Sequence, residues 1–240
     1  MALKDGGERG ERPRLLDLFC GAGGAAMGYH RAGFEVVGVD INPQPHYPFE
    51  FVQADVMELQ WLTAGTTKWA PGPVVHLEGI DAIHASPPCH DHTRSAHTLD
   101  GSGWLLGATR EILAKLGRAW VIENVPGAPM RADMRLCGCM FGLPKLQRER
   151  WFETSWEAFE LRPPCVHLEP AISVVGHGTP SGVNRAYRRL GSGEGSYGSL
   201  ARKAMGITWM NRGELSQAIP PAYTEWIGRQ LLSALGKVAA

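Results

Sequence analysis

The chain has 240 residues, with 24 Lys and Arg against 24 Asp and Glu, and 44% of its residues are hydrophobic. These values exclude a disordered or fibrous chain and fit one globular domain that carries a small insertion. No apolar run reaches the roughly 20 residues that a membrane helix needs, and residues 1–14 hold no apolar core like that of a signal peptide. We therefore expect a soluble cytoplasmic protein without membrane partners.

Charge and cysteine usage narrow the functional classes. Residues 1–130 hold 10 Lys and Arg against 15 Asp and Glu, whereas residues 131–240 hold 14 against 9. The second half is thus the candidate face for a polyanion, with ordinary surface variation as the alternative. Five cysteines, an odd number, do not fit a disulfide framework, so each is better considered as a thiol, a ligand or a nucleophile.

The first half of the chain alternates β-rich apolar runs with helical patterns. This alternation predicts an α/β fold with a mostly parallel sheet covered by helices. The predicted strands are Leu15–Cys20, Glu35–Asp40, Glu50–Ala54, Asp81–Ser86, Trp120–Val125 and Arg150–Thr154. The predicted helices of this half are Gly24–Ala32 and Trp104–Leu116.

The composition changes after the last predicted strand. Residues 156–198 are rich in Gly, Ser and Pro and read as a small loop-rich insertion. Helical patterns return at Ser199–Met205, Gly213–Gln217 and Ala222–Leu235. We therefore expect a flexible N-terminus (1–13), a main domain (14–155), the insertion (156–198) and C-terminal helices (199–240) that complete the main domain.

A glycine-rich loop, Phe19-Cys20-Gly21-Ala22-Gly23-Gly24, follows the first predicted strand and opens a helix. Glycines let the backbone turn tightly and approach a ligand, although a purely structural turn is the default for such a loop. Asp40 ends the second strand, where a carboxylate can accept hydrogen bonds from ribose hydroxyls, and Asp55 follows the third, where one can accept from an adenine amino group. The loop lacks the triphosphate-binding pattern. The pattern favours an adenosine ligand without a long phosphate tail.

Three further motifs carry candidate chemistry. Ser86-Pro87-Pro88-Cys89 stands at the carboxyl end of a predicted strand, where open α/β sheets bind ligands, and presents a thiol on a stiff loop. Glu123-Asn124-Val125 ends another strand, where a buried carboxyl can have a raised pKa and act as an acid. Arg148 and Arg150 alternate on one strand face and could clamp an anion or a base carbonyl. Taken singly, a loop cysteine, a satisfied carboxylate and a solvated strand remain the alternatives.

In this order and spacing, the motifs resemble those of the DNA cytosine methyltransferases that act at carbon 5. The glycine loop is similar to the family's F-x-G-x-G motif, Pro88-Cys89 to its Pro-Cys motif, and Arg148-Glu149-Arg150 to its R-x-R motif. Glu123-Asn124-Val125 matches its Glu-Asn-Val motif. Residues 216–221 resemble its G-N-x-V-P-P element, with Ser-Gln in place of Gly-Asn. The resemblance covers residues 14–154 and 199–235.

The resemblance implies a Rossmann-like methyltransferase sheet, S-adenosylmethionine as cofactor and double-stranded DNA as partner of a monomeric enzyme. It makes Cys89 the nucleophile that adds to carbon 6 of a flipped-out cytosine. Protonated Glu123 would stabilise the ring, and Arg150, or less directly Arg148, would hold the carbonyl oxygen at carbon 2. The implied cofactor contacts are Phe19, Gly21, Ala22, Gly23, Gly24, Asp40, Ile41, Asp55, Val56, Pro88 and Gln217.

The insertion is short for a target-recognition region. Fewer side chains can then reach base edges, so we expect a short or relaxed target sequence that is contacted by Arg185, Arg188 and Arg189. Two alternatives remain open. One is a tRNA cytosine methyltransferase, and the other is a catalytically silent nucleic-acid-binding protein of the same fold.

Two cysteine pairs raise the question of a metal. Cys137 and Cys139, together with Cys165 and His167, offer a ligand set that zinc accepts. Both pairs have single-residue spacing, which is tighter than usual, and nothing in the sequence brings them together. We therefore expect no metal site, and we interpret His90, His92 and His97 as substrate-loop residues.

Overall fold

The computed structural model describes residues 12–62, 73–88, 103–157, 164–168, 171–172, 174 and 197–237. Cys89, the three histidines after it and the three candidate DNA-binding arginines lie outside the described residues, as does most of the expected insertion. Among the described residues, no helix has both the length and the apolar character needed to cross a bilayer.

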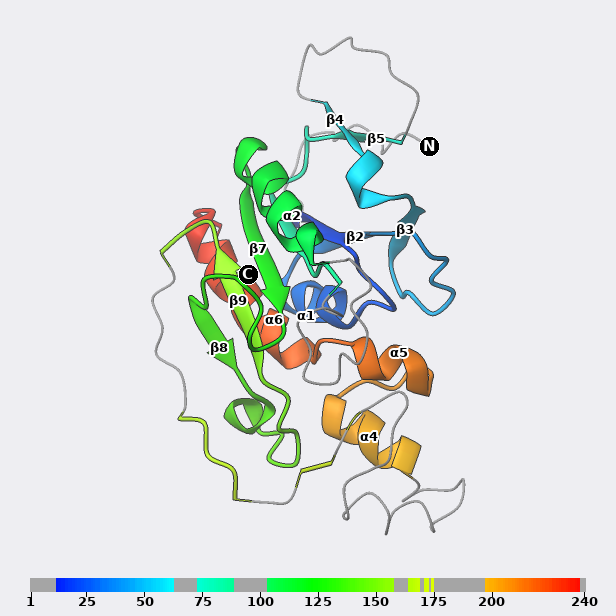
Figure 1. The fold of residues 1–240 in the computed structure, drawn as a ribbon, viewed down its shortest axis with the longest axis vertical. Coiled ribbons are helices and arrows are strands. Elements are labelled where there is room, and N and C mark those ends of the chain that lie inside the picture. Colours follow the sequence, from blue (N-terminus) through cyan, green and yellow to red (C-terminus); the bar gives the residue numbers. More distant parts are fainter. Residues whose placement is uncertain are drawn as a thin grey trace.

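The core of the fold is a seven-stranded sheet with the order β3-β2-β1-β6-β7-β9-β8 (Figure 1). The neighbouring strands from β3 to β7 pair in parallel, and β9 runs antiparallel to both β7 and β8. A second sheet pairs β4 (Gln60–Leu62) with β5 (Val74–His76). The strands of the main sheet are β1 (Arg14–Leu18), β2 (Glu35–Asp40), β3 (Glu50–Gln53), β6 (Ala82–Ala85), β7 (Ala119–Asn124), β8 (Met134–Leu136) and β9 (Arg150–Thr154).

The chain order of the sheet reverses between β1 and β6. From β1 the chain moves outward to β2 and β3, then returns to place β6 on the other side of β1. At such a switch point the loops that follow the two strands diverge and leave a crevice at the carboxyl ends. The topology alone therefore places a ligand site beyond Leu18 and Ala85.

Helices cover both faces of the sheet. Leu15 packs on the face that holds α1 (Gly24–Ala32) and α6 (Pro221–Ala234), whereas Leu16 packs on the face that holds α2 (Trp104–Lys115). Because successive strand side chains point to opposite faces, near-continuous apolar runs are what a doubly covered strand requires. The described residues also form the helices α4 (Tyr197–Met205) and α5 (Arg212–Gln217) and the 3₁₀ turns η1 (Val56–Glu58) and η3 (Gly138–Phe141).

The C-terminal helix α6 packs tightly on α1. A Cβ atom at Gly28 would overlap Thr224 Oγ1 and the carbonyl oxygen of Pro221, so only glycine permits this approach. The Thr224 hydroxyl donates to the carbonyl of Ala25 at 2.8 Å. The helix that ends the described chain is thereby fixed to the helix that follows the glycine loop.

The α/β class and each predicted strand and helix are confirmed, with bounds that either match or shift by at most two residues. The strands β4, β5 and β8 were not predicted. Each has only three residues, and β8 alternates buried Met134, exposed Arg135 and buried Leu136 over too short a stretch to give a period.

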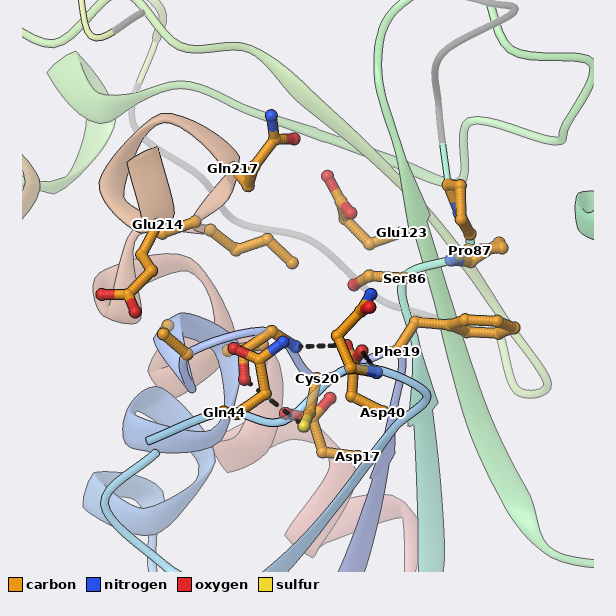
Figure 2. A pocket seen from close by; sticks show the side chains of 18 of the residues that line it. Asp17, Phe19, Cys20, Asp40, Gln44, Ser86, Pro87, Glu123, Glu214 and Gln217 are labelled. Carbon is orange, nitrogen blue, oxygen red and sulfur yellow. Dashed lines mark hydrogen bonds between the residues drawn. The ribbon is translucent and has the colours of Figure 1, made fainter. Parts of the chain in front are cut away.

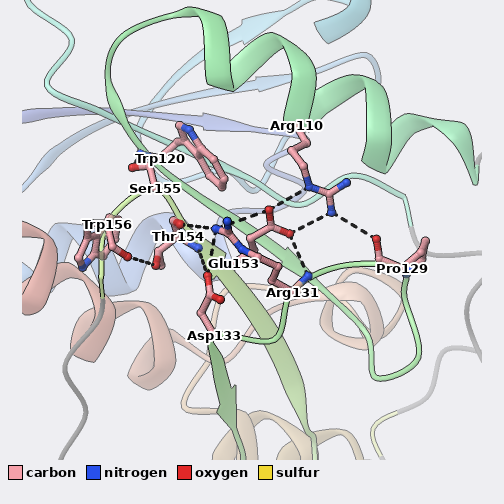
Figure 3. A network of polar contacts seen from close by, with 9 residues as sticks. All are labelled: Arg110, Trp120, Pro129, Arg131, Asp133, Glu153, Thr154, Ser155 and Trp156. Atoms are coloured by element: carbon pink, nitrogen blue, oxygen red, sulfur yellow. Dashed lines mark hydrogen bonds and ion pairs between the residues drawn. The ribbon is translucent and has the colours of Figure 1, made fainter.

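A buried carboxylate links β9, the strand next to the edge of the sheet, to α2 (Figure 3). Glu153 in β9 is 1% exposed and accepts two hydrogen bonds of 2.9 Å from the guanidinium of Arg110. The backbone N–H of Arg131 donates to the same carboxylate at 3.2 Å. The bidentate geometry fixes α2, the loop after β7 and β9 in one arrangement.

Replacing Glu153 with alanine should lower the free energy of unfolding by about 3 kcal/mol, because it leaves a half-buried guanidinium without its partner. The matched control is Glu225→Ala, which breaks the exposed pair with Arg229 on α6 and should cost less than about 0.5 kcal/mol. Urea denaturation at neutral pH measures both values. Equal losses in the two variants would contradict the role given to the buried carboxylate.

Candidate functional site

The glycine loop after β1 turns the chain sharply into α1. Phe19 adopts φ 56°, a left-handed conformation that is uncommon for a non-glycine residue, and Gly21 and Gly23 follow with φ of 49° and 84°. The loop is held to β2 because the N–H of Gly21 donates to Asp40 Oδ2 at 3.0 Å. Asp40 Oδ1 accepts from the N–H of Asn42 at 2.9 Å. Both oxygens of this carboxylate therefore hold backbone N–H groups in place, and each oxygen retains a lone pair for a ligand.

The loop forms one wall of a cavity of about 530 Å³ at the carboxyl ends of β1, β2, β6 and β7. Its size lies within the range of small-molecule sites. In Figure 2, Glu123, Ser86 and Pro87 lie on one side of the cavity, and Glu214 and Gln217 of α5 lie on the other, with the carboxylate of Glu214 pointing away from it. Of the predicted cofactor contacts, those that line it are Phe19, Gly21, Ala22, Gly24, Asp40, Ile41, Pro88 and Gln217.

Three predicted cofactor contacts lie elsewhere in the structure. Asp55 caps η1, where its Oδ1 accepts from the N–H of Met57 at 2.8 Å. Val56 is 3% exposed and packs in the core on the α2 face of the sheet. A Cβ atom at Gly23 would lie 2.8 Å from Pro48 Cδ and 3.0 Å from Tyr47 Cδ2, so its absence serves loop packing. None of the three is among the residues that line the cavity.

Glu123 is the penultimate residue of β7 and presents its carboxyl group to the cavity. Its side chain is 7% exposed, and Arg150 Nε from β9 lies 2.9 Å from its Oε1, an ion pair that lacks hydrogen-bond alignment. Burial raises the pKa of Glu123 above its usual value, although the charge of Arg150 opposes the shift. The group is therefore poised to hold a proton at higher pH than an ordinary glutamate.

A chain of hydrogen bonds from Ser86 through His84 to Tyr29 supports Glu123. Ser86 hydrogen-bonds its carboxylate, and Ser86 Oγ lies 2.9 Å from Nε2 of the fully buried His84. The other ring nitrogen of His84 lies 3.0 Å from the hydroxyl of Tyr29. Burial lowers the pKa of His84 to about 3, so the imidazole is neutral at physiological pH. This uncharged network orients Ser86 without placing a cation behind Glu123.

Arg148, two residues before Arg150, binds backbone instead of lining the cavity. Its guanidinium donates to the carbonyl oxygens of Ala218, Val174 and Ser216 at 3.1, 3.2 and 2.5 Å. The sequence predicted a shared strand face for the two arginines, but β9 begins only at Arg150. Arg148 thus anchors the segment that carries Gln217, and Arg150 alone reaches Glu123.

Asp17 and Cys20 also line the cavity, although the sequence analysis assigned neither of them a role of its own. Asp17 is 0% exposed, and its carboxylate oxygens make no well-aligned hydrogen bond among the described residues, although the backbone N–H of Ala26 lies close enough to oppose the rise in its pKa. Burial, with Asp40 and Glu123 nearby, raises its pKa well above the usual value. Burial likewise raises the pKa of the Cys20 thiol. An acidic residue inside the apolar run Leu15–Leu18, two positions before the loop, was the available signal for Asp17.

The Pro-Cys motif is described only up to Pro88. The carbonyl oxygen of Pro87 accepts from Asn124 Nδ2 at 3.1 Å, which joins the end of β6 to the Glu-Asn-Val motif at the end of β7. Pro88 lines the cavity, and Cys89 is the next residue in the chain but lies outside the described residues.

Comparisons with known proteins give one curated relative and related folds. The type II methyltransferase M.HgiGI of Herpetosiphon aurantiacus is 29% identical over 126 residues, which cover 48% of this chain and 92% of the relative. The Entamoeba histolytica methyltransferase EhMeth matches with a TM-score of 0.57 at 12% identity, covering 94% of this chain and 99% of that chain. The S. pombe Dnmt2 methyltransferase matches with a TM-score of 0.54 at 14% identity, covering 93% and 99%. No protein-family model matches the sequence. The two structures confirm the predicted Rossmann-like methyltransferase fold.

Proposed function

Since the motifs and the comparisons support the cytosine methyltransferase family, we propose that this chain transfers a methyl group from S-adenosylmethionine to carbon 5 of cytosine in double-stranded DNA. The observation that carries the proposal is the cavity itself. It brings the glycine loop, Asp40, Glu123 and Arg150 from separate strands to one place, with Pro88 at its rim. Each of these groups belongs to a different motif of the family.

The cavity fits S-adenosylmethionine by volume and by charge. Asp17 and Asp40 face it with carboxyl groups, and the oxygens of Asp17 make no well-aligned hydrogen bond among the described residues. A cofactor that carries an ammonium group and a sulfonium would satisfy them. We propose that Asp40 binds the ribose hydroxyls through its free lone pairs and that Phe19 lies against the adenine.

When bound, S-adenosylmethionine supplies a methyl group made electrophilic by its sulfonium. We propose that the Cys89 thiolate adds to carbon 6 of cytosine, which makes carbon 5 nucleophilic enough to take that methyl group. Protonated Glu123 donates to ring nitrogen 3 and stabilises the negative charge that the addition creates. Removal of the proton from carbon 5 then eliminates the cysteine.

Arg150 is the side chain that we propose holds the carbonyl oxygen at carbon 2 of the base, because it lies at the cavity beside Glu123. Arg148 is proposed as a positioning residue, since its donors are engaged by three backbone carbonyls. Its contacts to Ser216 and Ala218 hold Gln217 at the opposite wall.

The test of this function compares methyl acceptors. The protein is incubated with methyl-labelled S-adenosylmethionine and either duplex DNA of varied sequence or tRNA, and the products are digested to nucleosides. Label in 5-methyldeoxycytidine supports the proposal. Label in tRNA would overturn the DNA assignment, and label in N4-methylcytosine or N6-methyladenine would overturn the chemistry at carbon 5. Cofactor binding without any transfer would indicate the silent binding protein.

We propose that Arg185, Arg188 and Arg189 contact DNA phosphates and bases. Replacing all three with alanine should weaken DNA binding and reduce the slope of log K against log salt by up to about 3, roughly 0.9 for each phosphate that is no longer neutralised. Fluorescence anisotropy with labelled duplex over a salt series measures the slope. The control is Arg229→Ala on α6, where the arginine pairs with Glu225 at the surface. An unchanged slope in the triple variant would remove these residues from the interface.

A further inference from the structure

The structure brings together four side chains that the cofactor cavity does not use. Cys137 follows β8, Cys139 lies in η3, and Cys165 and His167 come from a segment 26 residues farther along the chain. One potential ligand atom from each lies within 4.8 Å of all the others. No local pattern in the sequence brings the two pairs together, and their meeting is a product of the fold.

The distances between the sulfur and nitrogen atoms of these side chains are close to those between the ligands of a tetrahedral zinc site. Cys139 Sγ lies 3.4 Å from Cys165 Sγ, and His167 Nε2 lies 3.3 Å from Cys137 Sγ and 3.2 Å from Cys165 Sγ. With Zn–S of about 2.3 Å and Zn–N of about 2.0 Å, a tetrahedral site has sulfur–sulfur edges near 3.8 Å and sulfur–nitrogen edges near 3.5 Å. The four groups are therefore within a few tenths of an ångström to one ångström of the required positions.

The backbone is shaped to hold this cluster. A Cβ atom at Gly138, between the two cysteines, would lie 2.5 Å from the carbonyl oxygen of Leu146, so the tight Cys-Gly-Cys turn needs glycine. Cys137 is 3% exposed and packs in the core on the α1 and α6 face, whereas Cys165 and His167 are exposed. Cys137 is thus held by the core, whereas Cys165 and His167 lie at the surface.

We propose that Cys137, Cys139, Cys165 and His167 bind one zinc ion. Three thiolates and an imidazole form a closed set without an open position, which is typical of structural zinc sites. The ion joins residues 137–139 to residues 165–167, and it fixes the segment that leads along the chain to the candidate DNA-binding arginines. The proposal does not depend on the methyltransferase assignment, because metal content is measured without activity.

A disulfide between Cys139 and Cys165 is the competing interpretation of the same contact. It would need the two sulfurs to close from 3.4 Å to about 2.05 Å, and it would leave Cys137 and His167 without a role. Zinc uses all four side chains at once. The two interpretations differ in metal content and in thiol count.

The experiment begins with the full chain, purified under reducing conditions through a tag that contains no histidine, and measures metals by mass spectrometry. We expect about one zinc per chain, and we expect the cobalt-exchanged protein to show the strong visible absorption of a tetrahedral thiolate site. The zinc content of the Cys139→Ser/Cys165→Ser variant should fall to nearly zero, whereas the Cys89→Ala variant should keep its zinc. Removal of zinc from the unmodified chain should lower Tm by on the order of 10 °C.

The unmodified chain decides the proposal even where the double variant fails to fold. Protein that binds no zinc, either as purified or after reconstitution with the metal, overturns the proposal. Iron in place of zinc, or a Cys139–Cys165 disulfide mapped in non-reduced peptides, overturns it as well. Loss of zinc from Cys89→Ala would move the site away from the four residues named.

Discussion

Replacing Cys89 with alanine should abolish methyl transfer, lowering kcat by at least about four orders of magnitude. The alanine variant has no group to add to carbon 6, and cytosine carbon 5 is not nucleophilic enough by itself. The measurement uses duplex DNA that contains 5-fluorocytosine, whose fluorine cannot leave as the carbon 5 proton does. The unmodified chain should form a protein–DNA adduct that resists denaturation, and Cys89→Ala should form none. Equilibrium dialysis should show S-adenosylmethionine bound by both.

Cys20 is the matched control for this experiment, because its thiol lines the cavity. Burial and the neighbouring Asp17 raise the pKa of Cys20, so it remains an un-ionised thiol and a poor nucleophile. Cys20→Ser should therefore still form the adduct with 5-fluorocytosine. An adduct that still forms with Cys89→Ala and disappears with Cys20→Ser would make Cys20 the nucleophile and contradict the proposal.

The fold was predictable where the sequence repeats a simple physical pattern. The strands Glu35–Asp40 and Arg150–Thr154 and the helix Gly24–Ala32 match their predicted bounds, because each combines an apolar run with a clear stop such as Gly33. The three-residue strands β4, β5 and β8 could not be predicted, because pairing with a neighbouring strand, and not their own sequence, makes them strands. The position of β9 between β7 and β8 likewise depends on pairing that no local pattern encodes.

The site was predictable as a set of motifs and not as a set of contacts. Motifs state which residues follow a strand, so the placement of Asp40 and Glu123 at one sheet edge could be expected. They do not state what a side chain will bind. Asp55 caps a 3₁₀ turn and Arg148 binds carbonyls because those partners are set by the folded backbone. For the same reason, the sequence could name Cys137, Cys139, Cys165 and His167 as a ligand set but could not show that the two pairs meet.

Replacing Glu123 with glutamine should lower kcat by about 10²- to 10³-fold at neutral pH. The amide has nearly the same shape and retains an N–H donor, but it cannot deliver a proton to ring nitrogen 3 as charge develops there. Since burial raises the pKa of Glu123, its protonated fraction persists above the usual range and then falls as pH rises through that pKa. The unmodified enzyme should accordingly lose activity on the alkaline side.

That alkaline loss separates a proton donor from a residue that only shapes the cavity. Glu123→Gln carries no titrating group, so its residual activity should lack the alkaline limb that Glu123 produces, while Glu149→Gln should retain it. Glu149 is a fair control because it lies one residue before Arg150 and is engaged at the surface with Trp151 Nε1 at 2.6 Å. Single-turnover rates over a pH series measure the three profiles. If the glutamine variant kept the alkaline limb of the unmodified enzyme, the proton would come from another group, and the buried Asp17, whose pKa is also raised, would be the next to test.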